Sequence, residues 1–176
     1  ARRAFARARR QVQEAGHEAA EHIEQGIMIE VPSCIPILPE LLAQVDFATV
    51  GTNDLVQYVL AADRNSERMV DAYDPCHPAV IRFLDTIIRT AREAHVPMSV
   101  CGETASDLAF LPLLLGLGYS GLSANVQAVP YIRHTVRQLS MADCRELAQR
   151  ALKATAADET HALLDRFAEA RADGEG

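Results

Sequence analysis

Lysine is almost absent from this sequence of 176 residues. Lys153 is the only lysine, the other positive charges are arginines, and the net charge at pH 7 is −7. Nucleic acids are bound through clustered Lys and Arg, so this acidic balance argues against a nucleic-acid partner. An acidic chain that acts on an anionic substrate needs a cation to offset the repulsion.

Closely spaced cysteines and long apolar runs are also missing. Four cysteines stand far apart, without a CxxC pair or a histidine at zinc-ligand spacing, so neither structural zinc nor a disulfide framework is expected. Residues 108–122 form the longest apolar stretch, which Pro112 and three glycines interrupt. This is shorter than the ~20 residues of a membrane span. Without a signal peptide, a cytoplasmic location and no membrane partner are expected.

Short β-rich runs alternate with helical patterns along the chain. Residues 1–24, with arginines followed by Glu14, Glu18 and Glu21, predict a solvated N-terminal helix. The sequence does not begin with Met, which suggests that it starts inside a longer protein. The pattern predicts strands at 26–31, 45–51, 97–101 and 119–123, and helices at 37–44, 55–62, 79–95, 108–115, 129–139 and 142–171.

Alternation of strands and helices predicts an α/β fold with a parallel sheet. The strands are nearly continuous in apolar character, as expected where both faces are covered. An open doubly wound sheet and part of a (β/α)₈ barrel both fit this pattern. In either case, polar residues that follow the strands gather at one edge of the sheet, at the carboxyl ends.

Two carboxylates follow neighbouring predicted strands. Glu30 ends the run Gly-Ile-Met-Ile-Glu, and Asp54 follows the second strand in Gly51-Thr-Asn-Asp. Asn53 and Asp54 are also good helix caps, and Asp54 with Gln57 fits a capping box. Because no lysine lies nearby in sequence to neutralise them, Glu30 and Asp54 predict a site for a hard cation such as Mg²⁺.

Two further side chains fit such a site. The guanidinium of Arg64 could bind a phosphate or carboxylate held on the metal, although a solvated helix-end arginine is the commoner interpretation. Cys101 ends the third strand and precedes Gly102. The acidic surroundings disfavour a thiolate nucleophile, so a protonated thiol that donates a proton is predicted. None of the six histidines is assigned a chemical role.

Three motifs, in this order and spacing, resemble enzyme I of the bacterial phosphotransferase system. They are Gly26-Ile-Met-Ile-Glu-Val-Pro, the run from Gly51-Thr-Asn-Asp to Asp63-Arg64, and Cys101-Gly-Glu. Enzyme I binds phosphoenolpyruvate in a (β/α)₈ barrel and passes its phosphoryl group through a histidine to the carrier protein HPr. The resemblance covers roughly residues 25–152.

The resemblance implies a role for each candidate residue. Glu30 and Asp54 would bind Mg²⁺, Asn53, Asp54 and Arg64 would contact the substrate, and Cys101 would protonate the enolate to give pyruvate. The chain would start the phosphoryl relay to HPr for sugar uptake or nitrogen-related regulation.

The resemblance also implies an incomplete barrel. Four predicted strands correspond to the C-terminal half of a TIM (β/α)₈ barrel, at residues 25–140, followed by a helical segment at 141–176. The phosphohistidine domain that reaches HPr, and the first four barrel strands, are not in this sequence. Half a barrel exposes open edges and apolar surface, so a homodimer, aggregation or marginal stability is expected.

Three other interpretations stay open at this point. A fragment of pyruvate phosphate dikinase or phosphoenolpyruvate synthase would share the barrel and the cysteine. A magnesium-dependent lyase of the citrate-lyase or aldolase kind would also hold an enolate between Glu and Asp, without needing Cys101. A non-catalytic dimerisation or regulatory module would retain the fold alone.

Overall fold

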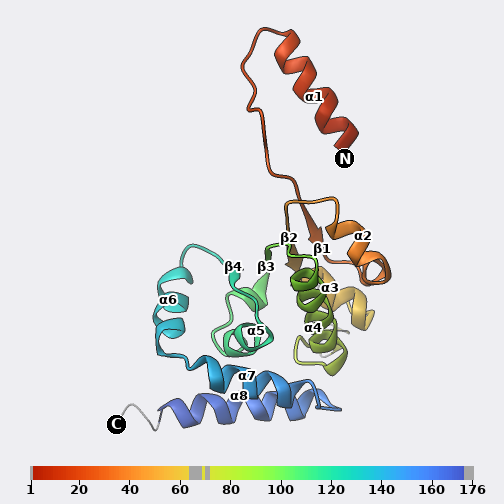
Figure 1. Ribbon diagram of the computed structural model, residues 1–176. Coiled ribbons are helices and arrows are strands. Elements are labelled where there is room, and N and C mark those ends of the chain that lie inside the picture. The colour runs from red at the N-terminus through yellow and green to blue at the C-terminus, as the bar shows by residue number, and fades with distance from the viewer. Residues whose placement is uncertain (1, 64–68, 70–71, 173–176) are drawn as a thin grey trace.

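The computed structural model describes residues 2–63, 69 and 72–172. Helices and strands alternate along most of the chain, as the sequence predicts (Figure 1). The elements are α1 (Arg2–Glu14), β1 (Gly26–Ile29), η1 (Pro32–Ile37), α2 (Leu38–Leu42), β2 (Phe47–Gly51), α3 (Thr52–Leu60), α4 (Pro78–Glu93), β3 (Met98–Cys101), η3 (Glu103–Ala105), α5 (Leu111–Leu117), β4 (Gly121–Ser123), α6 (Val129–Gln138), α7 (Met141–Ala151) and α8 (Ala157–Ala172).

Within the described residues, the strands form one parallel sheet in the order β1-β2-β3-β4. Consecutive strands are neighbours, and each βα unit leads to the next strand, which is how a (β/α)₈ barrel is built. The expected α/β fold, with four parallel strands corresponding to half of such a barrel, is confirmed.

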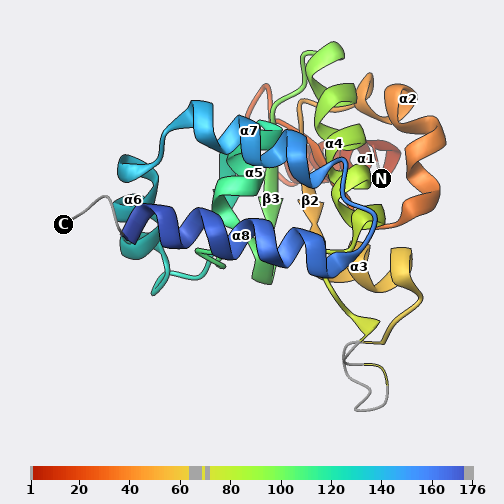
Figure 2. The ribbon, with the colours of Figure 1, turned by 90° about the horizontal axis from the view of Figure 1, so that it is seen from below.

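Helices cover one face of the sheet and form the core with it. Ile29, Ala48, Val50 and Val100 alternate along the strands with less buried residues and are almost fully buried. They pack with apolar side chains of α2, α3, α4 and α5 in one cluster. Seen from below, α7 and α8 lie side by side as an outer layer next to α5 (Figure 2).

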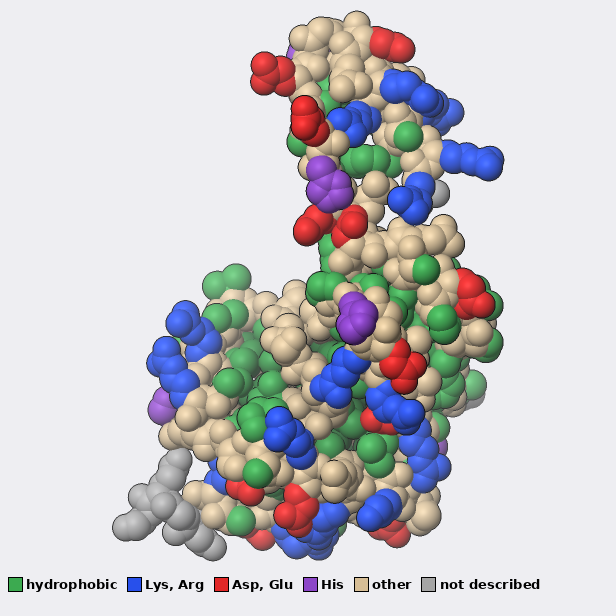
Figure 3. All heavy atoms as spheres, viewed as in Figure 1, with side chains coloured by type: hydrophobic (Ala, Val, Ile, Leu, Met, Phe, Trp, Pro, Cys, Tyr) green, Lys and Arg blue, Asp and Glu red, His purple; other side chains and the backbone are tan. Residues whose placement is uncertain are grey.

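The other face of the sheet is largely uncovered. Met28 and Phe47 point to this face and are 53% and 40% exposed. Thr49, opposite Met28 in the register, has a buried hydroxyl without a hydrogen-bond partner among the described residues. Figure 3 shows hydrophobic side chains exposed in the middle of the molecule on the face in view. An apolar sheet face of this kind is typical of a barrel interior whose second half is missing.

Two predicted helices were wrong in extent. The N-terminal helix ends at Glu14 instead of continuing to residue 24, because Gly16 adopts a positive φ of 80°. None of residues 2–14 is buried, and α1 stands apart from the sheet (Figure 1).

The predicted helix at 142–171 is two helices, α7 and α8. Arg82 of α4 donates hydrogen bonds to the carbonyls of Leu152 (3.4 Å) and Ala154 (2.9 Å), where α7 ends. The carboxylate of Glu159 accepts hydrogen bonds from the Thr155 backbone N–H (2.8 Å) and hydroxyl (3.3 Å). These tertiary and local bonds stabilise a turn that the helical periodicity alone does not reveal.

The packing of α7 on α5 depends on Gly116. A Cβ atom at this position would overlap the carbonyl oxygen of Cys144 in α7. Cys144 is fully buried at this contact, and burial raises the pKa of its thiol. The absence of a side chain at Gly116 therefore sets how closely the two helices approach.

We expect Gly116→Ala to destabilise the chain by about 1–3 kcal/mol, because the new methyl group forces α5 and α7 apart. Helix propensity alone predicts the opposite sign, a gain of about 1 kcal/mol. Urea denaturation followed by circular dichroism would measure the change, with Ser120→Ala, at a nearby exposed position, as the control. An increase in stability would contradict the packing argument.

Candidate functional site

The carboxyl ends of the four strands meet at one edge of the sheet, here called the rim. Gly51 pairs with Cys101, and Cys101 pairs with Ser123. Ile29 pairs with Val50, so Glu30, the next residue, comes beside Gly51. The predicted site residues that follow these strands therefore gather from three separate parts of the sequence.

The side chain of Glu30 lies across Gly51. A Cβ atom at Gly51 would come within 2.8 Å of Glu30 Oε2 and 3.0 Å of Met28 Sδ. Gly51 is buried at the end of β2. Its lack of a side chain leaves room for a carboxylate that is only partly exposed to water.

The predicted capping role of Asn53 and Asp54 was wrong. Helix α3 begins at Thr52, and Gly51 is its N-cap without a side-chain hydrogen bond. Asn53 and Asp54 are therefore in the first turn of the helix. The positive end of the helix dipole favours a carboxylate at the position of Asp54.

A buried hydroxyl network joins the β2–α3 turn to the end of β3. The Thr52 hydroxyl donates to the carbonyl of Cys101 (2.8 Å) and lies 2.7 Å from the hydroxyl of Thr104. Gly102 lies between them with a φ of 105°, and a Cβ there would collide with Thr52 Oγ1 and Asn53 Oδ1. Both the conformation and the space at this position require glycine.

Asn53 has a structural role in the same region. Its side-chain oxygen accepts a hydrogen bond from the backbone N–H of Glu103 (2.9 Å), and its backbone carbonyl accepts one from the Tyr73 hydroxyl (3.3 Å). Because the amide oxygen is engaged, the NH₂ group is the end of this side chain that can donate to an anion.

Cys101 presents a half-buried thiol at the end of β3. Its Sγ donates a hydrogen bond to the carbonyl of Val50 at 3.4 Å. This hydrogen bond orients the thiol at the end of β3.

An open pocket of about 490 Å³ lies beside this thiol. Four of its residues, Ser106, Asp107, Ser123 and Asn125, were not predicted as site residues from the sequence, although Ser123 ends β4 and the other three follow β3 or β4 in the chain. A search of the polar residues at and after the end of each predicted strand could have identified these four. The lining is Asn53, Cys101, Gly102, Glu103, Ser106, Asp107, Ser123 and Asn125.

The donor set of the rim fits a hard cation. Glu30 and Asp54 are each partly buried, and within the described part of the chain neither makes a salt bridge or a hydrogen bond. Carboxylates withdrawn from water without a partner favour a bound cation. Two carboxylate oxygens leave most positions of an octahedral ion open to water and substrate. Arg64, the predicted phosphate contact, lies outside the described residues.

The family of the chain follows from comparison with known proteins. Residues 1–141 match the family model described as PEP-utilising enzyme, PEP-binding domain. The chain belongs to this family, whose name describes a domain that binds phosphoenolpyruvate.

Individual relatives come from the phosphotransferase system. The chain is 43% identical over 174 residues to the "Phosphoenolpyruvate-dependent phosphotransferase system" protein of Escherichia coli, covering 95% of this chain and 23% of that protein. It is 41% identical over 152 residues to "Multiphosphoryl transfer protein 1" of E. coli, covering 86% of this chain and 18% of that protein.

A third relative is the "Phosphoenolpyruvate-protein phosphotransferase" of Staphylococcus carnosus. It is 37% identical over 152 residues, covering 86% of this chain and 26% of that protein. The resemblance to enzyme I is therefore confirmed, and the chain spans about a quarter or less of the length of these relatives. None of the described helices has the length and apolar character needed to cross a membrane.

We expect Thr52→Val to destabilise the chain by about 1–3 kcal/mol. Valine has a similar shape, but it leaves the buried hydroxyl of Thr104 and the carbonyl of Cys101 without their partner. Chemical denaturation would measure the loss. The control is Thr86→Val, which removes an exposed hydroxyl and should change stability by less than about 0.5 kcal/mol. Equal effects of the two substitutions would contradict the role of the buried network.

Proposed function

We propose that this chain provides the substrate-binding rim of a phosphoenolpyruvate-protein phosphotransferase, the first step of a phosphoryl relay to an HPr-type carrier. The observation that supports this best is the rim itself: two partly buried carboxylates, which make no salt bridge or side-chain hydrogen bond among the described residues, lie at the same edge of the sheet as a half-buried thiol. Membership of the PEP-binding family makes phosphoenolpyruvate the substrate of choice. The relatives do not favour a dikinase or synthase fragment.

In this proposal, Glu30 and Asp54 bind Mg²⁺. The ion, when bound, would stabilise negative charge on the phosphoryl group and on the enolate oxygen. The amide NH₂ of Asn53 and the guanidinium of Arg64 bind phosphate oxygens. The buried turn at Thr52, Gly102 and Thr104 keeps these elements in register with the end of β3.

Cys101 acts as the proton donor. Loss of the phosphoryl group to a histidine leaves the enolate of pyruvate, and the thiol proton passes to its methylene carbon to give pyruvate. The thiolate that remains is then reprotonated from solvent. The hydrogen bond from Sγ to the Val50 carbonyl fixes the position of the thiol at the end of β3.

The proposed organisation has an N-terminal segment at 1–24 that contains the shorter helix α1, half of the PEP-binding barrel at 25–140 and a helical segment at 141–176. The uncovered sheet face with Met28 and Phe47 supports closure by further strands or by a second copy of the chain. A cytoplasmic location and a homodimer are part of the same proposal.

The metal ligands can be tested in a chimera that replaces the matching segment of the S. carnosus phosphotransferase with this chain. We expect Glu30→Gln and Asp54→Asn each to raise the Mg²⁺ concentration needed for half-maximal PEP-dependent phosphorylation at least tenfold, because each removes one ionised oxygen ligand. Glu93→Gln and Asp158→Asn, which neutralise exposed carboxylates elsewhere, are the matched controls. An unchanged Mg²⁺ requirement in both rim variants would refute these ligands.

The proton donor can be tested separately in the same chimera. We expect Cys101→Ser to slow formation of pyruvate about 10²-fold or more, since the weaker acid is a poor donor to carbon. Binding of PEP, measured by calorimetry with Mg²⁺ present, should change little. Cys34→Ser is the control, because Cys34 lies in η1 and outside the pocket. Normal pyruvate formation in Cys101→Ser would exclude the proposed role.

A further inference from the structure

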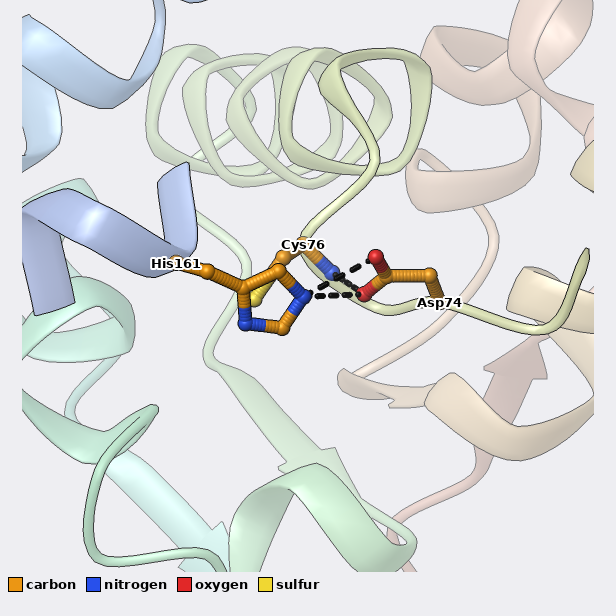
Figure 4. A group of neighbouring side chains, drawn as sticks. All are labelled: Asp74, Cys76 and His161. Carbon is orange, nitrogen blue, oxygen red and sulfur yellow. Dashed lines mark hydrogen bonds and ion pairs between the residues drawn. The ribbon is translucent and has the colours of Figure 1, made fainter. Parts of the chain in front are cut away.

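A second group of ligand-type side chains lies away from the rim, where the loop before α4 meets α8. Asp74 and Cys76 come from the loop, and His161 comes from the second turn of α8. Figure 4 shows the three side chains side by side, with the Asp74 carboxylate directed at the imidazole ring. Asp74 and His161 are 87 residues apart in sequence, which is why the spacing of cysteines and histidines gave no sign of a site.

The three side chains are already held close to one another. His161 Nε2 lies 3.0 Å from Asp74 Oδ2 and 3.2 Å from Oδ1. The backbone N–H of Cys76 donates to Asp74 Oδ1 at 2.8 Å, which fixes the carboxylate beside the thiol. One ligand atom from each residue can be chosen so that all three lie within 4.8 Å of one another.

These distances are close to those in a tetrahedral zinc site. With metal–ligand distances of about 2.0–2.1 Å for N and O and about 2.3 Å for S, neighbouring ligand atoms are roughly 3.3–3.6 Å apart. The nitrogen and oxygen atoms are therefore almost in place, and a small movement of the sulfur completes the set. Sulfur, imidazole nitrogen and carboxylate oxygen are the three donor types that zinc binds in proteins.

The group of three side chains is open to solvent on one side. Cys76 is 4% exposed, whereas the side chains of Asp74 and His161 are 25% and 53% exposed, so an ion can enter from the side of the histidine.

We propose that Asp74, Cys76 and His161 bind a zinc-type divalent cation that ties α8 to the loop before α4. Coordination forms a metal–sulfur bond and releases the thiol proton to solvent, and water completes the fourth position. The ion replaces the direct contact between His161 and Asp74 by two metal bonds. It is distinct from the hard cation proposed at the rim, whose ligands are oxygens only.

The site connects the C-terminal helices to the rim. Tyr73, next to Asp74, donates its hydroxyl to the Asn53 carbonyl, and Asn53 in turn accepts from Glu103. A metal at Asp74 therefore stabilises the loop that supports the β2–α3 turn.

Cobalt(II) is the probe, because its absorption reports both a thiolate ligand and tetrahedral geometry. The untagged, reduced chain should bind one Co²⁺ with a sulfur-to-cobalt charge-transfer band, and Zn²⁺ should displace it while Mg²⁺ does not. Cys76→Ser should abolish the band, and His161→Ala should weaken binding by more than tenfold. Free zinc at 100 times its Kd should raise the Tm by about 5–10 °C.

Matched variants separate this site from the rest of the chain. Cys34→Ser, the exposed His134→Ala, and the double variant Glu30→Ala, Asp54→Ala should leave the cobalt band unchanged. His161 is on the surface, so His161→Ala should keep the circular dichroism spectrum of the parent chain. The proposal is wrong if no charge-transfer band appears, if the band survives Cys76→Ser, if it depends on Cys101, or if His161→Ala binds as tightly as the parent.

Discussion

The parallel register of the four strands is the constraint on which the candidate site depends. Each strand ends within a residue of its neighbour, so Glu30, Gly51, Cys101 and Ser123 share one edge although they are widely separated in sequence. A shift of one residue between β1 and β2 would turn Glu30 toward the helices, because side chains alternate between the two faces of a strand. The apolar layer of Ile29, Val50 and Val100 beneath the helices makes such a shift costly.

Glycine and threonine residues at the strand ends position the side chains of the candidate site. Gly51 gives the Glu30 carboxylate room to lie over β2, and Gly102 allows η3 to approach Thr52 and Asn53. The hydroxyls of Thr52 and Thr104 satisfy polar groups that would otherwise be buried without partners. None of these glycines and threonines is proposed to contact the substrate, yet they determine the positions of Asn53, Asp54 and Cys101.

The two proposed cation sites differ in chemistry as well as in place. The rim offers oxygen ligands and lies on the first turn of α3 and the end of β1, where a substrate can share the ion. The group at Asp74 offers sulfur, nitrogen and oxygen, and it joins a loop to the outer helix α8. This difference in ligand type allows one chain to hold a hard and a softer cation without exchange between them.

Much of this architecture follows from the sequence alone. Alternating short apolar runs and helical patterns indicated the four strands, and polar residues after them indicated Glu30, Asp54 and Cys101, because local periodicity and the common direction of parallel strands carry that information. The three motifs indicated the family. The ends of α1, and the turn between α7 and α8, did not follow, since Arg82 and Glu159 stabilise the turn through bonds that periodicity does not encode.

Tertiary structure alone decided which distant residues meet. The contact of Gly116 with Cys144, the network of Thr52 with Thr104, and the group formed by Asp74, Cys76 and His161 each join segments at least 28 residues apart. No local pattern marks such pairs, because their proximity results from how the helices pack on the sheet. The sequence by itself indicated the four strands, the positions of most helices and the polar residues at the strand ends, and packing determined which distant side chains lie together.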